Sequence, residues 1–202
     1  MIKVGITGGI ASGKTTITNF LKKRGWAIHD SDAVVKKIYS LPTKSFIFFL
    51  KKIKLHHAIS GKKISKTIIR NEIFNNKTTK KKIENFIHAE VRTAREKFLK
   101  KHKKKKTKIV ILDIPLLFEA RLIKICDYII LLTLPQKTKI QRALKRKGMN
   151  KEILLKILKH QISDSHKKKK SDFVVNTSKT KKESYKQIML ALKKIKLLNT
   201  KK

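Results

Sequence analysis

Residues 8–15 read GGIASGKT, a segment that matches the pattern G-x-x-x-x-G-K-[ST]. A short apolar run at residues 2–6 precedes the segment, and apolar side chains at the spacing of one helical face follow it. The predicted order is therefore a strand, a glycine-rich loop and a helix. Because this is the structural context in which the pattern binds phosphate groups, the segment is a strong indication of a P-loop.

The residue types of the loop suit a nucleoside triphosphate and Mg²⁺. Glycines let successive backbone N–H groups converge on phosphate oxygens, and the helix that begins near Gly13 adds the positive end of its dipole. Lys14 can reach the β- and γ-phosphates, and the Thr15 hydroxyl can ligate Mg²⁺. We therefore predict that ATP and Mg²⁺ bind at the loop residues Gly8, Gly9, Ala11, Ser12, Gly13, Lys14, Thr15 and Thr16.

Strand and helix patterns alternate along the rest of the chain. Short apolar runs at residues 26–28, 109–112, 128–132 and 173–175 are typical of strands, and helical patterns separate them. This alternation predicts an α/β fold with a parallel sheet. Residues 41–106 are mainly helical and contain no strong strand, which indicates a helical insertion between consecutive strands.

The sequence also suggests where several helices end. The clearest helix covers about residues 80–99, and the lysine run at 100–106 is interpreted as a solvated turn. The basic stretch at 166–170 is expected to lead directly into the last strand. Further helices are predicted at 136–147, 151–165 and about 180–198.

A phosphate-binding loop alone does not distinguish a kinase from a GTPase or a motor ATPase. A small GTPase should carry a guanine-reading N-K-x-D segment after a later strand, and the sequence has none. A motor ATPase would usually be larger and place a catalytic Glu after an acidic strand end. Here the run at 109–112 ends in Asp113, a second candidate for holding the metal through water, and Ile114 and Pro115 follow it.

Two carboxylates follow the second predicted strand, at Asp30 and Asp32. In a parallel sheet this strand end and the P-loop face the same crevice, and in an extended segment both positions point to the same side. A carboxylate there could orient an acceptor hydroxyl and take its proton during phosphoryl transfer. The alternatives are structural: Asp30 could form a turn, and Ser31 or Asp32 could cap the helix that follows.

The charge of the chain leaves a second class of function open. There are 53 Lys and Arg residues against 13 Asp and Glu, a formal net charge of +40, which ordinarily suggests a polyanionic partner. The lysines are spread over nearly every segment and no aromatic platform is interleaved with them, so a codon bias toward A and T explains them better. No specific nucleic acid is expected, and a basic nucleic-acid-associated P-loop ATPase stays as an alternative.

Cysteine usage and hydropathy indicate the compartment. Cys126 is the only cysteine, so no intramolecular disulfide can form, and its thiol is expected to be buried beside a strand. No apolar signal core opens the chain, and no apolar stretch reaches the roughly 18 residues of a membrane-spanning helix. These features predict a soluble, cytoplasmic protein without a membrane partner.

Five segments together resemble the dephospho-coenzyme A kinase family, and the resemblance runs almost from end to end. The P-loop is common to many proteins, whereas the Asp-x-Asp after the second strand and the Pro-Leu-Leu-Phe-Glu segment are far more particular to this family. The segments are TGGIASGKTT at 7–16, HDSDAVVKKIY at 29–39, IENFIHAEVR at 83–92, LDIPLLFEARL at 112–122 and SDFVVNTS at 171–178.

This resemblance implies that ATP phosphorylates the ribose 3′-hydroxyl of dephospho-coenzyme A, the last step of coenzyme A biosynthesis. It implies a P-loop three-layer fold with a five-stranded parallel sheet, a helical acceptor domain and a lid. The core is expected at 1–40, 107–145 and 171–202, the acceptor domain at 41–106 and the lid at 146–170, in a monomer. A nucleoside or nucleotide kinase with another acceptor is the alternative among enzymes.

The resemblance also gives roles to individual residues. Asp32 corresponds to the carboxylate that activates the acceptor, and it forms the expected catalytic set with Lys14 and Arg142. Arg142 and Arg146 occupy the lid side, where arginines of the family meet the transferring phosphate. Asn176 resembles the residue near the adenine.

Acceptor binding is expected from two places. One is a helical ridge on which His88, Arg92 and Arg95 stand at i, i+4 and i+7, although Ala89 replaces the proline that follows this histidine in the family. The other is the segment after the 109–112 strand, which could shape the acceptor pocket. The expected acceptor-binding residues are His88, Arg92, Pro115, Leu116 and Glu119.

Overall fold

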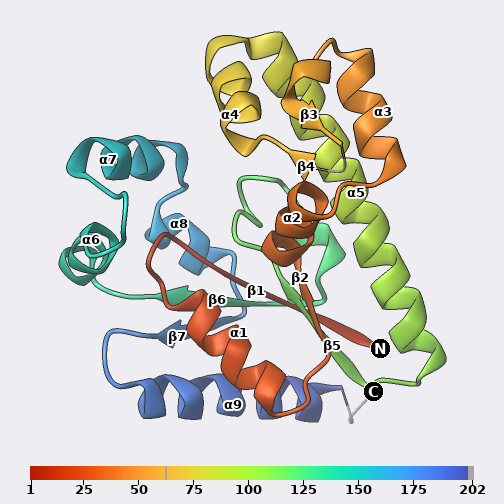
Figure 1. Cartoon of the computed structure of the whole chain (residues 1–202). Coiled ribbons are helices and arrows are strands. Elements are labelled where there is room, and N and C mark those ends of the chain that lie inside the picture. The colour runs from red at the N-terminus through yellow and green to blue at the C-terminus, as the bar shows by residue number, and fades with distance from the viewer. Residues whose placement is uncertain (62, 200–202) are drawn as a thin grey trace. The chain divides into compact units, whose positions relative to one another are not determined.

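The computed structural model describes residues 1–61 and 63–199, which form two compact units. The first unit comprises Met1–His29 and the described residues from His102 onward, and the second comprises Asp30–Lys101. Figure 1 labels the elements. The sheet strands are β1 (Ile2–Gly8), β2 (Ile28–Asp30), β5 (Ile109–Asp113), β6 (Tyr128–Thr133) and β7 (Phe173–Asn176). The helices of the first unit are α1 (Lys14–Lys23), α6 (Gln136–Leu144), α7 (Lys151–His160), α8 (Asp164–Lys169), α9 (Lys181–Leu198) and the 3₁₀ helix η2 (Ile123–Ile125).

The five strands form one sheet in the order β2-β5-β1-β6-β7. Strand β1 pairs in parallel with β5 and β6, and β6 pairs in parallel with β7. The register places Ile6 opposite Asp113 of β5 and Gly8 opposite Leu132 of β6, so these strands end at the same edge of the sheet. The expected α/β fold with a five-stranded parallel sheet is confirmed.

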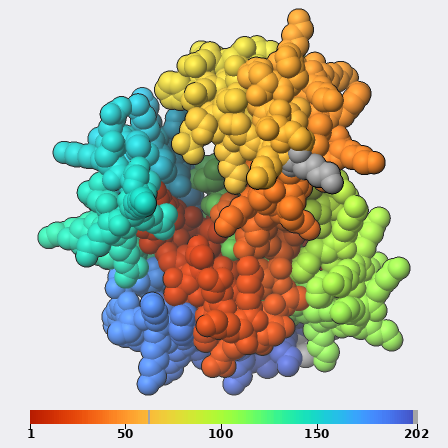
Figure 2. Space-filling view, viewed as in Figure 1, coloured from red at the N-terminus to blue at the C-terminus, as the bar shows by residue number. Residues whose placement is uncertain are grey.

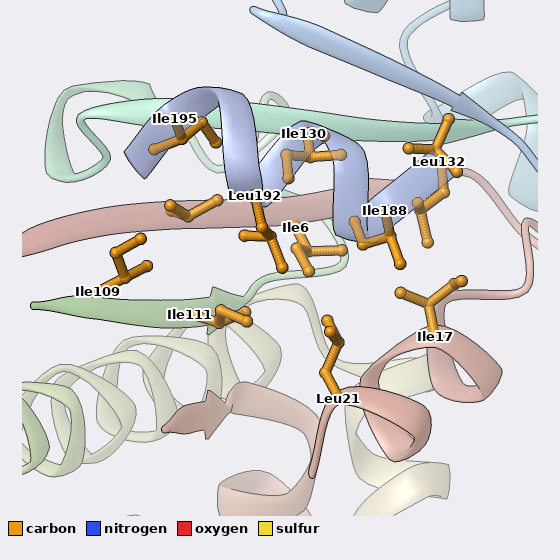
Figure 3. Packing of buried hydrophobic residues seen from close by; sticks show 13 residues of the cluster. Ile6, Ile17, Leu21, Ile109, Ile111, Ile130, Leu132, Ile188, Leu192 and Ile195 are labelled. Carbon is orange, nitrogen blue, oxygen red and sulfur yellow. The ribbon is translucent and has the colours of Figure 1, made fainter. Parts of the chain in front are cut away.

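Helices α1 and α9 cover one face of this sheet (Figure 3). Ile17 and Leu21 of α1 and Ile188 of α9 are at most 1% exposed and pack against the β-strand side chains. Each such burial stabilises the fold by about 1.5–3 kcal/mol. This packing holds α1 against the sheet, so only a short loop connects the end of β1 to the start of α1. The other labelled side chains of this core are Ile6, Ile109, Ile111, Ile130, Leu132, Leu192 and Ile195.

The second unit is mainly helical, as the sequence predicts. Its core joins all four of its helices through residues such as Ile38, Phe46, Ile69 and Ile83, and Phe86 stacks on Phe49 with ring centroids 4.4 Å apart. It also contains a two-residue antiparallel strand pair. The elements are α2 (Ser31–Ser40), α3 (Lys44–Lys52), η1 (His56–Ala58), β3 (Ile59–Ser60), β4 (Lys63–Ile64), α4 (Lys66–Asn75) and α5 (Lys77–Lys104), whose last turn continues into the first unit.

Some helix boundaries differ from the sequence prediction. The lysines at 100–104 extend α5 and are not a turn, because lysine is a good helix former and these exposed side chains need no packing partner. The predicted helix at 151–165 is two helices: α7 ends at His160, and Ser163 caps α8 by accepting a hydrogen bond from the His166 N–H. The basic stretch at 166–170 therefore begins within a helix.

One smaller expectation is wrong: Cys126 is half-buried rather than buried, although its Sγ atom packs closely against Gly5 of β1. Nearby, Asp172 has a structural role, because its carboxylate accepts a hydrogen bond of 2.7 Å from the Ile129 N–H at the start of β6. Among the described residues, none of the helices is long and apolar enough to cross a membrane.

A capping box begins α9 and gives the fold a pH-dependent contact. The Thr180 hydroxyl accepts from the Glu183 N–H, while the Glu183 carboxylate accepts from the Thr180 N–H. The backbone N–H of Thr180 is the main cause that holds the pKa of Glu183 below its usual range, and the Thr180 hydroxyl adds to it. Stabilisation by this carboxylate is therefore fully present above the ordinary pKa of a glutamate in the unfolded chain, and it is lost as the pH falls through the lower folded-state pKa.

We expect Glu183→Gln to lower the midpoint of urea unfolding at pH 7 and to leave it unchanged at a pH below both pKa values, where wild-type Glu183 is itself protonated. Urea titrations of the two proteins across this pH range measure the difference. Glu84→Gln, an exposed site within α5, serves as the control. A Glu183→Gln protein with the wild-type pH profile would contradict the prediction.

Candidate active site

The loop between β1 and α1 has the backbone conformation that an anion site requires. Ala11 and Gly13 both adopt positive φ angles, 58° and 78°, so that the loop folds back over the start of the helix. The Ser12 N–H donates to the Gly9 carbonyl, which closes the turn. Gly13 is the N-cap residue of α1. Among the described residues, no side-chain hydrogen bond caps this end of the helix. The first N–H groups of α1 are thus arranged to meet a phosphate.

Lys14 is held at the mouth of this loop by an ion pair. Its Nζ atom lies 2.6 Å from Oδ1 of Asp113, and the two side chains are 12% and 3% exposed. Asp113 ends β5, the strand beside β1, so the pairing follows from the sheet register. Lys14, the predicted phosphate-binding lysine, therefore lies beside Asp113, the second residue predicted to hold the metal.

The close approach of the loop to the sheet explains Gly8. A Cβ atom added at Gly8 would lie 2.4 Å from the Ser12 Oγ and 2.7 Å from the Leu132 carbonyl oxygen. Ser12 is buried, and its hydroxyl has no hydrogen-bond partner among the residues that the structure describes. Because a backbone oxygen of the sheet blocks the space, a larger residue at this position must displace the loop.

Gly8→Ala is accordingly expected to lower the free energy of unfolding by about 1–3 kcal/mol through overpacking, and to weaken ATP binding because the loop moves. Denaturant unfolding and calorimetric titration with ATP measure the two effects. Gly9→Ala is the matched control: its added Cβ would meet only side-chain ends, the nearest at 3.1 Å, which can shift. Equal effects of the two substitutions would refute this explanation of Gly8.

A cavity of about 370 Å³ lies beside the loop, on the side of α6 and α9. In Figure 2 the surfaces of α1 (red), α6 (teal) and α9 (blue) adjoin on this side of the first unit. The lining of the cavity includes the predicted residues Arg142 and Arg146 together with two lysines, so positive charge surrounds the cavity. The full lining is Ala11, Gly13, Thr16, Ile17, Arg142, Arg146, Thr177, Lys179, Lys181 and Ser184.

Arg142 and Thr177 brace the wall of this cavity. Arg142 donates to the carbonyl oxygens of Thr177, at 2.9 Å, and Ser178, at 3.3 Å. The Thr177 hydroxyl lies 2.9 Å from the Ser12 carbonyl of the P-loop, to which it donates. Asn176 is not among the cavity residues; its side chain accepts from the Ser178 N–H and shapes the turn after β7.

Sequence reasoning missed Thr177, Lys179 and Lys181. Within residues 171–178 only Asn176, the last residue of β7, was predicted to contact a ligand, although the turn after a strand at this sheet edge is where ligand-contacting residues are expected. Lysines 179 and 181 gave no signal, because lysine is common everywhere in this chain.

The predicted lid region also contacts the P-loop within the first unit. Gln161, between α7 and α8, accepts a hydrogen bond of 3.1 Å from the Ile10 N–H. Lys139 of α6 is 4% exposed, and its Nζ atom lies 2.6 Å from Oδ2 of Asp164, which also accepts from the Thr133 hydroxyl. None of these residues was predicted as part of the site, because the contacts link positions far apart in the sequence.

The segment after β5 lies beside β1. The Thr7 hydroxyl donates to the Pro115 carbonyl at 3.1 Å, while Leu116 is 47% exposed. The Glu119 carboxylate faces inward, where it lies 2.7 Å from the Nζ atom of Lys167 and accepts from the Ile162 N–H. The direct contact of these residues with an acceptor stays a prediction.

The second unit holds the remaining predicted residues. Strand β2 ends at Asp30 and α2 begins at Ser31, so Asp32 is an exposed residue in the first helical turn. The expectation that positions 30 and 32 share one side of an extended segment is wrong for this reason. The helix cap is Asp30, which accepts from the Ala33 N–H at 2.9 Å, and neither Ser31 nor Asp32 fills that position.

His88 and Arg92 of α5 are exposed to solvent. Arg95 lies on the same ridge of the helix but is only 9% exposed. The ridge is therefore not one continuous solvated face, and only His88 and Arg92 can meet a ligand from solvent. These two residues and Asp32 belong to the second unit, whereas the P-loop belongs to the first, and their roles stay predictions.

A parallel α/β sheet, a P-loop at the end of β1 and a basic cavity beside that loop define the chain as a P-loop nucleotide-binding protein. Comparison with known proteins gives the particular group. Residues 2–183 match the family model described as dephospho-CoA kinase. The chain belongs to the dephospho-CoA kinase family, whose members are kinases.

Individual relatives agree over nearly the full length. The dephospho-CoA kinase of Fusobacterium nucleatum subsp. nucleatum is 33% identical over 189 residues, which cover 92% of this chain and 94% of the relative. That of Wolbachia sp. subsp. Brugia malayi is 31% identical over 185 residues, or 92% and 93% of the two chains. Dephospho-CoA kinase from Campylobacter jejuni has a similar fold, with a TM-score of 0.73 at 24% identity and 98% coverage of both chains.

Proposed function

We propose that this chain transfers the γ-phosphoryl group of ATP to the ribose 3′-hydroxyl of dephospho-coenzyme A, giving coenzyme A and ADP in the last step of coenzyme A biosynthesis. The observation that carries the proposal is the P-loop at the end of β1, with Lys14 held at its mouth by Asp113. Membership of the family supports the choice of acceptor.

On the donor side, the N–H groups of the loop and of the first turn of α1 would hold the β- and γ-phosphates. Lys14 would stabilise the negative charge that develops on the oxygen between them as the bond to the γ-phosphorus breaks. Arg142 and Arg146 line the adjoining cavity, where their positive charges suit the phosphates of ATP. Asn176 would act near the adenine, through the turn that it shapes.

The residues at the loop also fit a Mg²⁺ ion. This ion usually takes one or two protein oxygens and completes its shell with phosphates and water. Asp113 offers a buried carboxylate and Thr15 an exposed hydroxyl in the first turn of α1. Residues 1–61 and 63–199 contain no group of three or more His, Cys, Asp or Glu that could hold a metal, which is compatible with a site that the nucleotide completes. When bound, Mg²⁺ would neutralise charge on the β- and γ-phosphates.

On the acceptor side, Asp32 would take the proton of the 3′-hydroxyl while that oxygen bonds to the γ-phosphorus. His88 and Arg92 would bind the acceptor through their polar groups, and Pro115, Leu116 and Glu119 would shape its pocket. In this proposal residues 41–106 form the acceptor domain and 146–170 the lid around the nucleotide core. The protein would act as a cytoplasmic monomer.

An acceptor assay tests the proposal. ADP release is followed at saturating ATP and Mg²⁺ with and without dephospho-coenzyme A, and the product is identified by its mass. We expect release to depend on the acceptor and coenzyme A to appear. No stimulation above the rate of ATP hydrolysis by water would overturn the proposal.

Two further measurements separate the alternatives. A panel of nucleosides and nucleoside monophosphates in the same assay distinguishes a kinase with another acceptor. Binding to nucleic acid is measured at several salt concentrations, because neutralisation of phosphates by a highly charged protein weakens steeply as salt rises. Binding that vanishes at modest salt would mark a counterion effect of the +40 charge, whereas saturable binding at physiological salt would favour a nucleic-acid-associated ATPase.

A further inference from the structure

Residues 161–167 contact two parts of the first unit that the proposed reaction uses. At one end Gln161 binds the P-loop through the Ile10 N–H. At the other end Lys167 binds the segment that follows β5, through Glu119. The segment is thus a direct physical connection between the ATP site and the predicted acceptor pocket.

The connection to the P-loop is fixed by a second contact. Asp164, three residues after Gln161, forms an ion pair with Lys139, and a Cβ atom added at Gly9 would lie 3.1 Å from Gln161 Oε1 and 3.4 Å from the Lys139 Nζ. The start of α8 therefore packs directly against the loop backbone.

The connection to the acceptor segment is an ion pair that is almost completely buried. The side chain of Lys167 is 0% exposed and that of Glu119 is 14% exposed, with Nζ and Oε1 2.7 Å apart. The same Oε1 accepts from the Ile162 N–H at 3.0 Å. The Oε1 atom of Glu119 thus contacts both Ile162, which precedes α8, and Lys167, which lies within α8.

A buried ion pair is by itself weak evidence of a role in stability. Removing two charges from water opposes most of their attraction, and well-packed apolar residues of similar volume often stabilise a protein as much. A buried charged pair does, however, restrict geometry, because separating the two groups inside the protein would leave each charge without its partner. The arrangement suits a role in positioning.

We propose that Lys167 is a positioning residue of the kinase reaction, which acts through Glu119 to hold residues 115–119 in register with the P-loop. The proposal rests on the proposed function, because it takes residues 115–119 as part of the acceptor pocket. Lys167 itself is buried, so in this proposal it acts through Glu119 and not by contacting either substrate. Its removal should therefore affect use of the acceptor more than binding of ATP.

A double-mutant cycle tests this role. Either single substitution, Lys167→Met or Glu119→Gln, leaves a buried charge without its partner. The double variant removes both charges, while the amide oxygen introduced by Glu119→Gln can still accept from the Ile162 N–H. We expect the double variant to keep wild-type resistance to urea and an ATP Kd within about threefold, but to lose at least about tenfold in kcat/KM for dephospho-coenzyme A. The folded single variants should lose as much as the double variant, because each breaks the same pair.

A partly exposed pair at the opposite end of β1 from the P-loop provides the control. The Nζ atom of Lys3 lies 3.2 Å from Oδ1 of Asp127, and the two side chains are 32% and 42% exposed. The double variant Asp127→Asn with Lys3→Met should keep wild-type kinetics. It reports the effect of the same change in charge outside the proposed site.

Several outcomes would overturn the positioning role. Unchanged acceptor kinetics in the folded buried-pair double variant would do so, as would equal losses in ATP binding and acceptor use. A loss in Glu119→Gln with normal kinetics in Lys167→Met would instead identify Glu119 as a direct acceptor ligand. If the unsubstituted chain does not phosphorylate dephospho-coenzyme A, the proposed function fails first and separately.

Discussion

The Lys14→Met variant is expected to transfer phosphoryl groups about a hundredfold to a thousandfold more slowly than the wild type, the loss typical when one preorganised charge-stabilising donor is removed. The side chain is held 2.6 Å from Asp113 at the mouth of the P-loop, where it can meet charge developing between the β- and γ-phosphates. Turnover is measured by coupled ADP release at saturating ATP and dephospho-coenzyme A. The loss should fall mainly on kcat.

Loss of stability must be separated from loss of catalysis, because Lys14→Met leaves the buried Asp113 carboxylate without this partner. Lys14→Arg keeps a positive charge beside Asp113 but not the compact ammonium geometry, so it should unfold at a urea concentration near that of the wild type and still be slow. Lys23→Met, exposed near the end of the same helix, is the control for net charge. Wild-type kcat in a folded Lys14→Met protein would remove this lysine from the mechanism.

Asp32→Asn should lower kcat by about 10²–10⁴-fold, the usual contribution of a general base, and leave the Kd for ATP nearly unchanged. The substitution keeps the size of the side chain and removes its ability to accept the proton of the acceptor hydroxyl. Rapid-quench measurement of coenzyme A formation gives the rate, and calorimetric titration gives the affinity.

Asp30→Asn is the matched control for this experiment. Asp30 caps α2 through the Ala33 N–H, and asparagine is an equally good N-cap, so the helix that carries Asp32 should be preserved. The two variants remove the same charge two residues apart. A similar loss in both would show that the charge of the region matters and would argue against Asp32 as the base.

Local patterns predicted the parts of the molecule that local physics determines. The P-loop lies between a buried strand and an amphipathic helix, and both can be inferred within residues 2–21. The short apolar runs likewise indicated the strands of the sheet, because strands buried on both faces need continuous apolar residues. The fold class followed from their alternation with helices.

Two errors arose where alternative local structures have similar free energies. Asp30, Ser31 and Asp32 are all acceptable helix caps, and only the structure shows that Asp30 is the one used. The helix at 151–165 breaks at 161–163, although the apolar spacing there gave no sign of it. In both cases the difference in free energy between local alternatives is small enough for tertiary contacts to decide.

The side-chain pairs of the site could not be predicted, because they join distant positions. Gln161 reaches Ile10, and Thr177 reaches Ser12, across most of the chain. Lys139 and Lys167 are two lysines among many, and only burial with a carboxylate partner sets them apart. A single sequence without such contacts gives no reason to choose them.

The left-handed Gly13 at the start of α1 has a consequence for the folded state itself. A helix normally begins with a side chain that satisfies its first N–H groups, and among the described residues this helix has none at that position. A phosphate of the bound nucleotide would fill the place of the missing cap. The nucleotide would then complete the secondary structure of the kinase, and we expect the first turn of α1 to be more stable when ATP is bound.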